Sequence, residues 1–516
     1  KKNFNDRHDL SVMVGTSHES ENYDRFTAKR INFDQQENMS LQLGSAQDQN
    51  AWSEGNQWTI NSFFSRVNYT FANKYVIEGT IRADGSSRFD PDHRWGWFPG
   101  VNVAWRVGEE GFMKRLGWFE DLKVRASYGE MGNQSGIGLY DYIQLISLSN
   151  DYYPFGTGVK GQMATSGNII STSRTWETIQ TTNVGFDFST LNNRLYGSFD
   201  YFWKENKNML IPKTYPSMLG ADAPSTNSGH LSIHGWEISL GWRDQIKDFS
   251  YSVRFNISDA KNKVVDRVGS NLIQLGNNET PTGYPLNSYF GYEFDGIIQN
   301  EQELEAYKSR FSEGGIPGDL SVGDAMYKDL DGDGKLSVLG DGKEGSGDVK
   351  YLGDKNPRYN FGFNLSMAWK GFDLSAFIQG VGRRTMFLEG ESRCPMPEAW
   401  YQSAEYWYGK TWIPERTDAQ YPAITLKDKR NYNYYVSTNT KFNVAYARLK
   451  NLQFGYTIPQ TLTSKAGLQK VRVYFSGEDL FEVHNTPNGW DPEENSGSIT
   501  SYPFTRNYSF GINVVF

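Results

Sequence analysis

The sequence lacks the residues and motifs on which several classes of protein depend. Its single cysteine, Cys394, cannot form an internal disulfide. The six histidines are scattered, and only His230 and His234 lie close together. A spacing of four on a strand separates them by about 13 Å, which argues against a zinc site. Nucleophile-elbow, H-E-x-x-H, P-loop and paired-cysteine motifs are all missing, so the sequence predicts a protein that is not an enzyme.

Long apolar runs are missing as well. No stretch reaches the roughly 18 residues that a membrane-spanning helix needs, and the mean hydropathy is −0.63. The first residues, KKNFNDRHDL, have no apolar core of a signal peptide. If the protein lies in an outer membrane, we therefore expect its true N-terminus to lie outside this sequence. The net charge of −8 is mild for 516 residues and does not indicate binding to nucleic acid.

Aromatic residues are abundant, at 15 % of the chain, and they recur in alternating patterns. This combination predicts packed β-sheet and argues against disorder. The C-terminal run YSFGINVVF places Tyr508, Phe510, Ile512, Val514 and Phe516 on one face of a strand. In a soluble protein such a strand would be an unprotected apolar edge, whereas lipid covers it in a membrane barrel. We interpret these five residues as a membrane-insertion signal.

The same alternation predicts roughly fourteen strands. They lie at about 9–18, 62–71, 75–82, 101–107, 122–128, 184–188, 195–203, 236–242, 251–257, 359–369, 372–376, 449–456, 471–477 and 508–516. A polar stretch at about 22–57 separates the first two. Short turns alternate with long loops at about 132–172, 265–357 and 385–440. Short turns on one rim and long loops on the other are typical of an outer-membrane barrel.

The face of each strand opposite the apolar one carries charges that can point into a wet lumen, among them Lys123, Arg125, Asp187, Glu237 and Arg254. The predicted fold is therefore an all-β transmembrane antiparallel β-barrel, a multi-pass protein of the cell outer membrane. A chain that ends on the short-turn side after an even number of strands is expected to be the later part of a larger barrel.

Several motifs are highly specific in combination. They include RADGSSRF (82–89), WGWFP (95–99), RASYGEMGNQ (125–134), YKDLDGDG (327–334) and YARLKNLQFGYTIP (446–459). Over essentially its whole length the chain resembles the SusC/RagA family of TonB-dependent transporters from Bacteroidota. The resemblance implies a barrel of 22 strands filled by an N-terminal plug. Residues 1–516 would be about the last 14 strands, with the plug and the first strands outside this sequence.

The resemblance also implies a function for the complete protein. Family members import a large nutrient across the outer membrane, most commonly a glycan oligosaccharide during polysaccharide utilisation. A SusD-like surface lipoprotein acts as a lid, TonB–ExbB–ExbD supplies the energy, and two transporter–lipoprotein pairs commonly form a dimer. Alternatives left open are a peptide importer of the same family, a siderophore or cobalamin receptor, a passive porin and a surface adhesin.

Two sets of loop residues are candidate binding sites. Asp329, Asp331 and Asp333 occupy positions one, three and five of a Ca²⁺-loop pattern, with the Lys335 carbonyl at position seven. Position twelve is Gly340, so Asp341 or Asp324 would have to replace the usual glutamate. The pattern predicts a structural Ca²⁺ and no organic cofactor, and the alternative is an ordinary polar turn.

Loop aromatics are the second set, because the apolar face of a sugar ring stacks on a flat aromatic ring. Tyr152 and Tyr153 lie in one long loop, and Trp400, Tyr401 and Trp407 lie in another. We predict that they contact a saccharide cargo. The alternatives are that they fold the loops or pack against the lid.

Overall fold

The computed structural model describes most of the chain. The residues outside the description are 1, 6, 35–36, 38, 48, 150–153, 156–158, 161–162, 168, 213–217, 219–223, 268–274, 277–279, 340–346, 398–401, 426–427, 495–496, 498–501 and 503. Within the described residues, no helix combines the length and the apolar character needed to cross a membrane. The chain divides into two compact units, residues 1–104, 126–182 and 204–230, and residues 105–125, 183–203 and 231–516.

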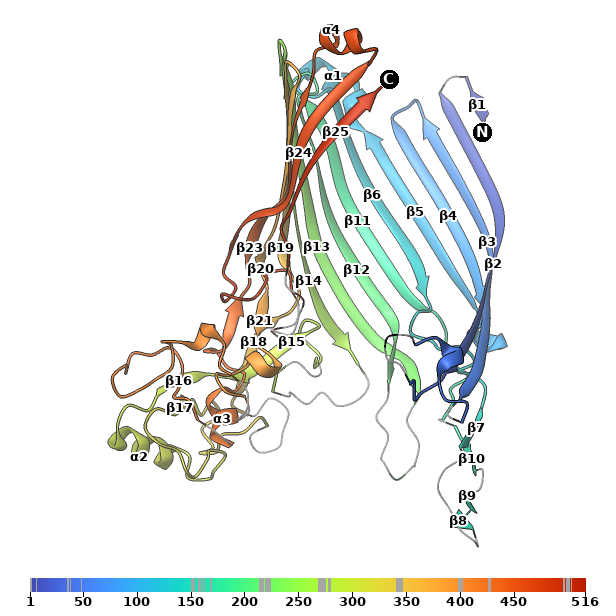
Figure 1. Cartoon of the computed structure of the whole chain (residues 1–516). Helices are drawn as coiled ribbons and strands as arrows, with labels where there is room; N and C mark the ends of the chain where they lie inside the picture. Colours follow the sequence, from blue (N-terminus) through green and yellow to red (C-terminus); the bar gives the residue numbers. More distant parts are fainter. Residues whose placement is uncertain are drawn as a thin grey trace. The chain divides into compact units, whose positions relative to one another are not determined.

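Fifteen strands of the described chain form one large sheet, in which neighbours follow in chain order (Figure 1). They are β1 (Lys2–Phe4), β2 (His8–Lys29), β3 (Asn50–Phe71), β4 (Tyr75–Ser86), β5 (Trp95–Arg106), β6 (Asp121–Asn133), β11 (Glu177–Thr190), β12 (Leu195–Pro212), β13 (Ser225–Ile246), β14 (Phe249–Asp266), β19 (Arg358–Trp369), β20 (Phe372–Arg383), β23 (Tyr446–Thr457), β24 (Lys470–His484) and β25 (Asn507–Val515).

The strand pairs form because apolar side chains oppose apolar side chains across each ladder. In β19 and β20, Leu365 pairs with Ala376 and Met367 pairs with Leu374. The turn between them is Lys370–Gly371, and both residues have positive φ, at 46° and 91°. This is the geometry of a tight two-residue hairpin turn, which glycine favours. The sequence therefore sets both the register and the turn of this hairpin.

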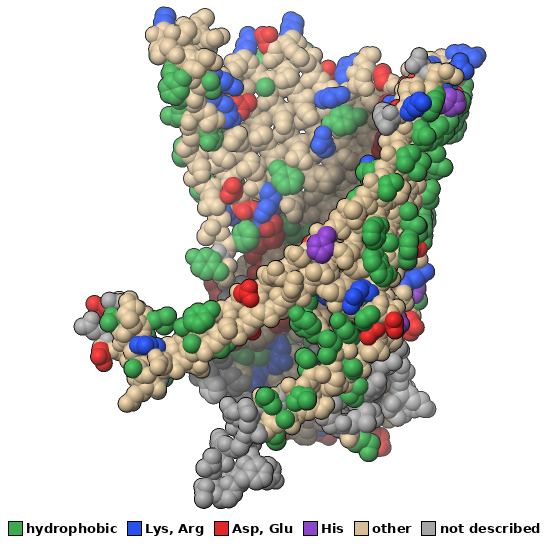
Figure 2. Space-filling view, turned by 90° about the vertical axis from the view of Figure 1, so that its right-hand side faces the viewer, with side chains coloured by type: hydrophobic (Ala, Val, Ile, Leu, Met, Phe, Trp, Pro, Cys, Tyr) green, Lys and Arg blue, Asp and Glu red, His purple; other side chains and the backbone are tan. Residues whose placement is uncertain are grey.

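Apolar side chains remain exposed along one face of the strands. On β2 and β3 they include Val12, Val14, Phe63 and Val67. Figure 2 shows hydrophobic side chains gathered along this part of the sheet. A soluble monomer rarely exposes so large an apolar area, whereas the outer face of a membrane barrel requires it.

All fourteen predicted strands are confirmed in the large sheet, to which β1 is the one addition, and the ten short strands of the described loop residues were not predicted. The expectation that the polar stretch 22–57 separates the first two strands was wrong at both ends, because β2 continues to Lys29 and β3 starts at Asn50. Their backbones stay fully paired there, from Asn22↔Gln57 to Lys29↔Asn50. A strand that extends into water needs backbone pairing but no apolar face, so hydrophobic alternation ends before the strand does.

Successive connections lie at alternate edges of the sheet, as antiparallel pairing requires, and the longest ones share one edge. One edge carries the turns 72–74, 191–194, 247–248 and 370–371, together with two longer connections that hold η3 (Val107–Glu109), α1 (Gly111–Leu116), α4 (Gln460–Thr463) and η7 (Ser464–Ala466). The opposite edge carries 30–49, 87–94, 134–176, 213–224, 267–357, 384–445 and 485–506. The three predicted long loops are confirmed, each a few residues displaced.

The long loops have secondary structure of their own. In the first unit, η1 (Leu41–Leu43) and η2 (Pro91–His93) lie in loops, β7 (Ile146–Ser149) pairs with β10 (Met163–Ser166), and β8 (Pro154–Phe155) pairs with β9 (Val159–Lys160). In the second unit the loop strands are β15 (Ser288–Tyr292), β16 (Phe294–Ile297), β17 (Ala325–Tyr327), β18 (Val349–Asp354), β21 (Thr385–Phe387) and β22 (Lys441–Asn443). The loop helices there are α2 (Glu301–Arg310), α3 (Asp428–Asn433), η5 (Gly390–Ser392) and η6 (Glu405–Trp407).

Loops 267–357 and 384–445 share one buried, tyrosine-rich core in the second unit. Tyr307 and Tyr432 join the two loops through their hydroxyl groups, 2.7 Å apart. The hydroxyl of Tyr327 donates to the backbone carbonyl of Tyr432 at 2.8 Å. Burial raises the pKa of Tyr327 and Tyr432 well above the usual range, so both phenols stay neutral. These two loops therefore fold together as one structure.

Candidate functional site

A cluster of charged residues lies where β23 and β24 reach the long-loop edge. Arg448 of β23 pairs directly with Glu482 of β24 in the ladder. A β-bulge between Leu449 and Asn451 then places Lys450 beside Asp479. Asp479 has a positive φ of 52°, a conformation that aspartate tolerates better than most residues. The bulge thus brings two cations and two carboxylates to the same place.

Arg448 is the centre of this cluster, and only 1 % of its surface is exposed. Its Nε donates to Glu482 Oε2 at 2.6 Å, and its Nη2 donates to Asp491 Oδ2 at 2.5 Å. Its Nη1 lies 3.2 Å from Glu493 Oε2. A buried guanidinium is tolerated only when it is paired in this way. We call Arg448, Lys450, Asp479, Glu482, Asp491, Glu493, Glu494 and Arg506 the Arg448 cluster.

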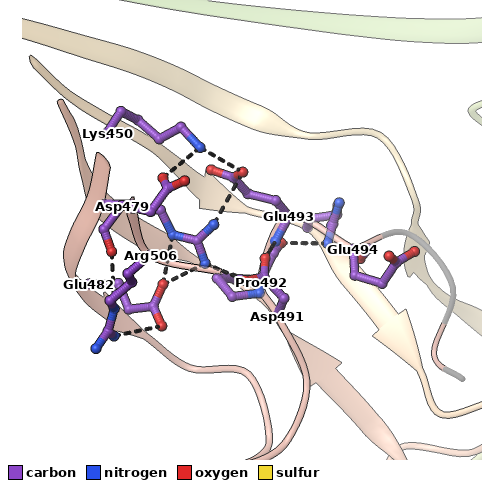
Figure 3. Close-up of polar contacts among 10 residues, drawn as sticks. Lys450, Asp479, Glu482, Asp491, Pro492, Glu493, Glu494 and Arg506 are labelled. Atoms are coloured by element: carbon purple, nitrogen blue, oxygen red, sulfur yellow. Dashed lines mark hydrogen bonds and ion pairs between the residues drawn. The ribbon is translucent and has the colours of Figure 1, made fainter. Parts of the chain in front are cut away.

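Lys450 extends the cluster toward the loop. Figure 3 shows its ammonium group between Asp479 and Glu493, with Nζ–oxygen distances of 2.8 and 3.0 Å. Arg506 approaches Glu482 at 3.7 Å from the other side. Alternation along β24 places Glu482 on the face opposite Phe481 and Val483, which are exposed and apolar. The cluster therefore lies on the polar face of the sheet, the face that lines the lumen of a barrel.

The same contacts hold loop 485–506 in place. Asp491 and Glu493 belong to this loop and bind Arg448. Nη2 of the buried Arg384 donates to the backbone carbonyls of Pro492 and Glu494, at 2.7 and 2.8 Å. Two arginines thus fix the loop through both its side chains and its backbone.

A hollow of about 610 Å³ opens beside the cluster. Its lining includes four carboxylates, from Asp479, Glu482, Asp491 and Glu494, and two guanidinium groups, from Arg448 and Arg506. Three aromatic residues, Trp490, Tyr502 and Phe504, also line it, together with His484, Asn488, Gly489 and Thr505. Tyr502 is 90 % exposed and Phe504 is 54 % exposed, so both rings are open to a ligand. The volume and the mixed polar and aromatic lining suit a small-molecule site.

The Asp329 loop has part of the predicted geometry. One carboxylate oxygen from each of Asp329, Asp331 and Asp333 lies within 4.8 Å of the others. Partial desolvation and the neighbouring carboxylates raise the pKa of Asp331. The carboxylate of Asp348, which the sequence did not indicate, accepts from the backbone N–H groups of Leu330 and Ser337 at 2.7 Å each and holds the loop. Asp341, the predicted further ligand, is outside the described residues.

The predicted aromatic contacts divide into two groups. Tyr152, Tyr153, Trp400 and Tyr401 are outside the described residues. Trp407 is only 3 % exposed and packs against Tyr406, Tyr421 and Tyr434, with ring centroids 5.1, 4.8 and 5.5 Å away. Its burial argues against the predicted cargo contact and matches the alternative, in which it folds the loop.

The C-terminal strand exposes its apolar side chains, and charged side chains on the opposite face of other strands form ion pairs. The apolar residues predicted as an insertion signal are exposed: Tyr508, Phe510, Ile512, Val514 and Phe516. On the polar face, Arg125 binds both Asp187 and Asp200, and Lys123 binds Asp187 at 2.7 Å. Three of the predicted polar-face charges, Lys123, Arg125 and Asp187, thus meet in one network.

Sequence reasoning missed the Arg448 cluster. Its members come from β23, from β24 and from loop 485–506, and the pairing of the strands together with the path of the loop brings them together. A signal was present in the acidic run Asp491, Glu493 and Glu494, which precedes the last strand, and in Arg448 and Lys450 at a spacing of two. Without knowledge of how the strands pair, the acidic run could not be connected to the two cations.

Comparison with known proteins identifies the family to which the chain belongs. A family model described as "TonB dependent receptor-like, beta-barrel" matches residues 1–480. The chain belongs to this family of outer-membrane β-barrel proteins.

Two curated relatives and one solved structure illustrate the likeness. TonB-dependent receptor P3 of Formosa agariphila is 31 % identical, over 99 % of this chain and 51 % of its own length. TonB-dependent receptor SusC of Bacteroides thetaiotaomicron is 26 % identical, over 91 % and 45 %. The chain thus spans about half the length of the curated relatives it matches. The solved RagAB peptide transporter has a TM-score of 0.80 at 22 % identity, over 99 % of this chain and 54 % of that one, which shows the same fold.

Proposed function

We propose that the complete protein imports a large nutrient, a glycan oligosaccharide, across the outer membrane in a TonB-dependent manner. The observation that carries the proposal is the match to the TonB-dependent receptor family over residues 1–480. The polar face with its ion pairs and the open hollow beside Arg448 support it, because a large polar solute needs a hydrated path. A peptide cargo is the second candidate, since a solved neighbour is named a peptide transporter.

The proposed partners follow from the physics of import. A large solute cannot cross lipid, and an open pore of the same width would leak. A SusD-like lipoprotein that caps the long loops and a plug that TonB–ExbB–ExbD moves would give access from one side at a time. Outer-membrane lipid would cover the apolar face, and a dimer of transporter–lipoprotein pairs is part of the proposal. Tyr152, Tyr153, Trp400 and Tyr401 are proposed cargo contacts.

Mild detergent extraction of outer membranes is expected to recover this protein with a SusD-like lipoprotein in equal amount and with short glycans retained. Mass spectrometry of the proteins and of the small molecules measures both. Cells without TonB should keep the complex but lose uptake of the glycan, because assembly does not need the energy source. A barrel recovered alone under the same conditions would contradict the lid. Retained peptides in place of glycans would favour the second candidate.

We also propose that the Asp329 loop binds a structural Ca²⁺. Oxygen ligands from Asp329, Asp331 and Asp333, spaced two residues apart and already converging, are the chemistry that Ca²⁺ prefers. The ion would neutralise three neighbouring carboxylates and tie the loop to the tyrosine-rich core.

Calcium is expected to protect loop 267–357 from proteolysis, and a chelator should remove the protection. At a Ca²⁺ concentration of 100 times the dissociation constant, binding would stabilise the folded loop by about 2.7 kcal/mol. Limited proteolysis in Ca²⁺ and in EGTA measures this difference. Asp331→Asn should abolish it, whereas Asp319→Asn, a change at an exposed aspartate of the same loop that is not in the carboxylate cluster, should not. Equal cleavage in Ca²⁺ and EGTA would count against the site.

Finally, we propose that Tyr508, Phe510, Ile512, Val514 and Phe516 form the membrane-insertion signal. Their exposure on the final strand supports this role, because an assembly factor could read them before lipid covers them.

A further inference from the structure

We propose that the hollow beside the Arg448 cluster is a cargo subsite that selects an uncharged saccharide over anionic glycans and over peptides. The proposal rests on the proposed import function and narrows its cargo class. The hollow lies at the end of β24 and in loop 485–506, on the long-loop edge. In an outer-membrane barrel this edge faces the cell's surroundings. A cargo that enters from outside therefore meets this surface early.

The charges of the hollow argue against an anionic cargo. Its lining has four carboxylates and two guanidinium groups. With Lys450 and Glu493, which lie behind the lining, the totals become five carboxylates and three cationic groups. Either set leaves a surplus of two negative charges. Arg448 and Lys450 are committed, since Arg448 binds Glu482 and Asp491, and Lys450 binds Asp479 and Glu493. The more exposed Arg506 donates from Nε to the backbone carbonyl of Asp479 at 3.0 Å and lies 3.7 Å from Glu482. A uronate or a sulfated sugar would face repulsion with no strong compensating ion pair.

The aromatic ring of Phe504 argues against a cationic cargo. The guanidinium carbon of Arg448 lies 4.8 Å from the ring centroid of Phe504, and the ammonium nitrogen of Lys450 lies 5.4 Å from it. Both side chains thus already make cation–π contacts with this ring. A lysine or arginine side chain of a peptide would add a third positive charge beside them. Three of the four carboxylates that could attract it, Asp479, Glu482 and Asp491, already belong to ion pairs.

What remains is a surface for a neutral, hydroxyl-rich ring. Phe504 and Tyr502 offer exposed aromatic faces on which the apolar side of a sugar can lie. Asn488, Thr505 and the paired carboxylates offer hydrogen-bond partners, and a carboxylate in an ion pair keeps free lone pairs that can accept from hydroxyl groups. Because Arg448 fixes the loop that carries Asp491, this surface exists before the ligand arrives.

The experiment uses the full-length transporter with its lipoprotein, purified from outer membranes. Three probes are titrated and binding is followed by calorimetry: neutral oligosaccharides cut from starch, laminarin and mannan, oligouronates cut from alginate and pectin, and a tryptic digest of casein. We expect binding of a neutral oligosaccharide, and about tenfold weaker binding in Phe504→Ala, which corresponds to the loss of one aromatic stack.

Two further variants keep the result interpretable. Phe481→Ala removes a phenylalanine that is 62 % exposed on the opposite, apolar face, and it should bind as the unmodified protein does. Tyr502→Ala, at a 90 % exposed position, should also weaken binding and cannot disturb the buried cluster. Migration of unheated samples in gels shows whether each barrel is folded.

The outcomes separate this inference from the proposed function. Neutral oligosaccharides that bind Phe504→Ala and Tyr502→Ala as tightly as the unmodified protein would overturn the subsite and leave glycan import standing. Binding of oligouronates alone would overturn the selection of a neutral sugar but not glycan import. Binding of casein peptides alone would overturn both.

Discussion

Replacing Arg448 with methionine is expected to lower the free energy of unfolding by about 3–5 kcal/mol, because it leaves partners of a buried ion pair without their cation. Methionine keeps much of the side-chain length, so the loss reflects charge more than volume. Glu482, Asp491 and Glu493 would then stand close together with only Lys450 and Arg506 to offset them. Urea unfolding of the barrel in lipid vesicles, followed by gel mobility of unheated samples, measures the change.

An exposed ion pair provides the matched control. Arg25 of β2 lies 3.4 Å from Glu54 of β3, and its side chain is 57 % exposed. Arg25→Met should change the unfolding free energy by less than about 1 kcal/mol, because water screens such a pair. Loop 485–506 should also become sensitive to protease in Arg448→Met only. Similar unfolding midpoints for the two variants would show that Arg448 does not hold the structure together.

Replacing Trp407 with alanine is expected to destabilise the folded loop 384–445 by about 3–5 kcal/mol, the usual result of emptying a buried tryptophan site. Trp407 lies in a cluster that includes Tyr421, Tyr434 and Trp490, so its loss would leave a cavity among aromatic rings. Limited proteolysis of the purified protein, with the cleavage sites mapped by mass spectrometry, measures the loosening of this loop.

The neighbouring residue is the control, because Tyr408 is 90 % exposed. Tyr408→Ala should leave the protease resistance unchanged. This pair of variants also decides between the two interpretations of Trp407. If Trp407→Ala keeps full protease resistance but loses cargo binding, the prediction of a direct cargo contact is right and the structural role is wrong.

The sheet could be predicted from the sequence because lipid imposes a strict rule on each strand. Wherever a strand crosses the bilayer, one face must be apolar, as in Val471, Val473 and Phe475 opposite β25. The rule ends where lipid ends, which is why residues 22–29 of β2 were not recognised as strand. Most of their side chains are polar and no apolar alternation continues through them, so only their backbone pairing shows the strand.

The candidate site could be predicted only where its residues are neighbours in the chain. Asp329, Asp331 and Asp333 form their own turn, and the structure brings their carboxylates together. Arg448 and Asp491 are joined by tertiary structure, so no local pattern marks the pair. Trp407 shows a further limit, because an aromatic residue in a polar loop has the same sequence signature whether its ring is buried or exposed.

The length of the β2–β3 hairpin has a consequence for the outside of the cell. Each strand has 22 residues, which corresponds to roughly 70 Å, whereas a barrel strand needs about 9–11 residues to cross the bilayer. The connection 30–49 joins the two strands at the long-loop edge, where we expect their extra length to project from the membrane. We therefore expect this connection to be an epitope on intact cells, which an antibody raised against residues 30–49 would label.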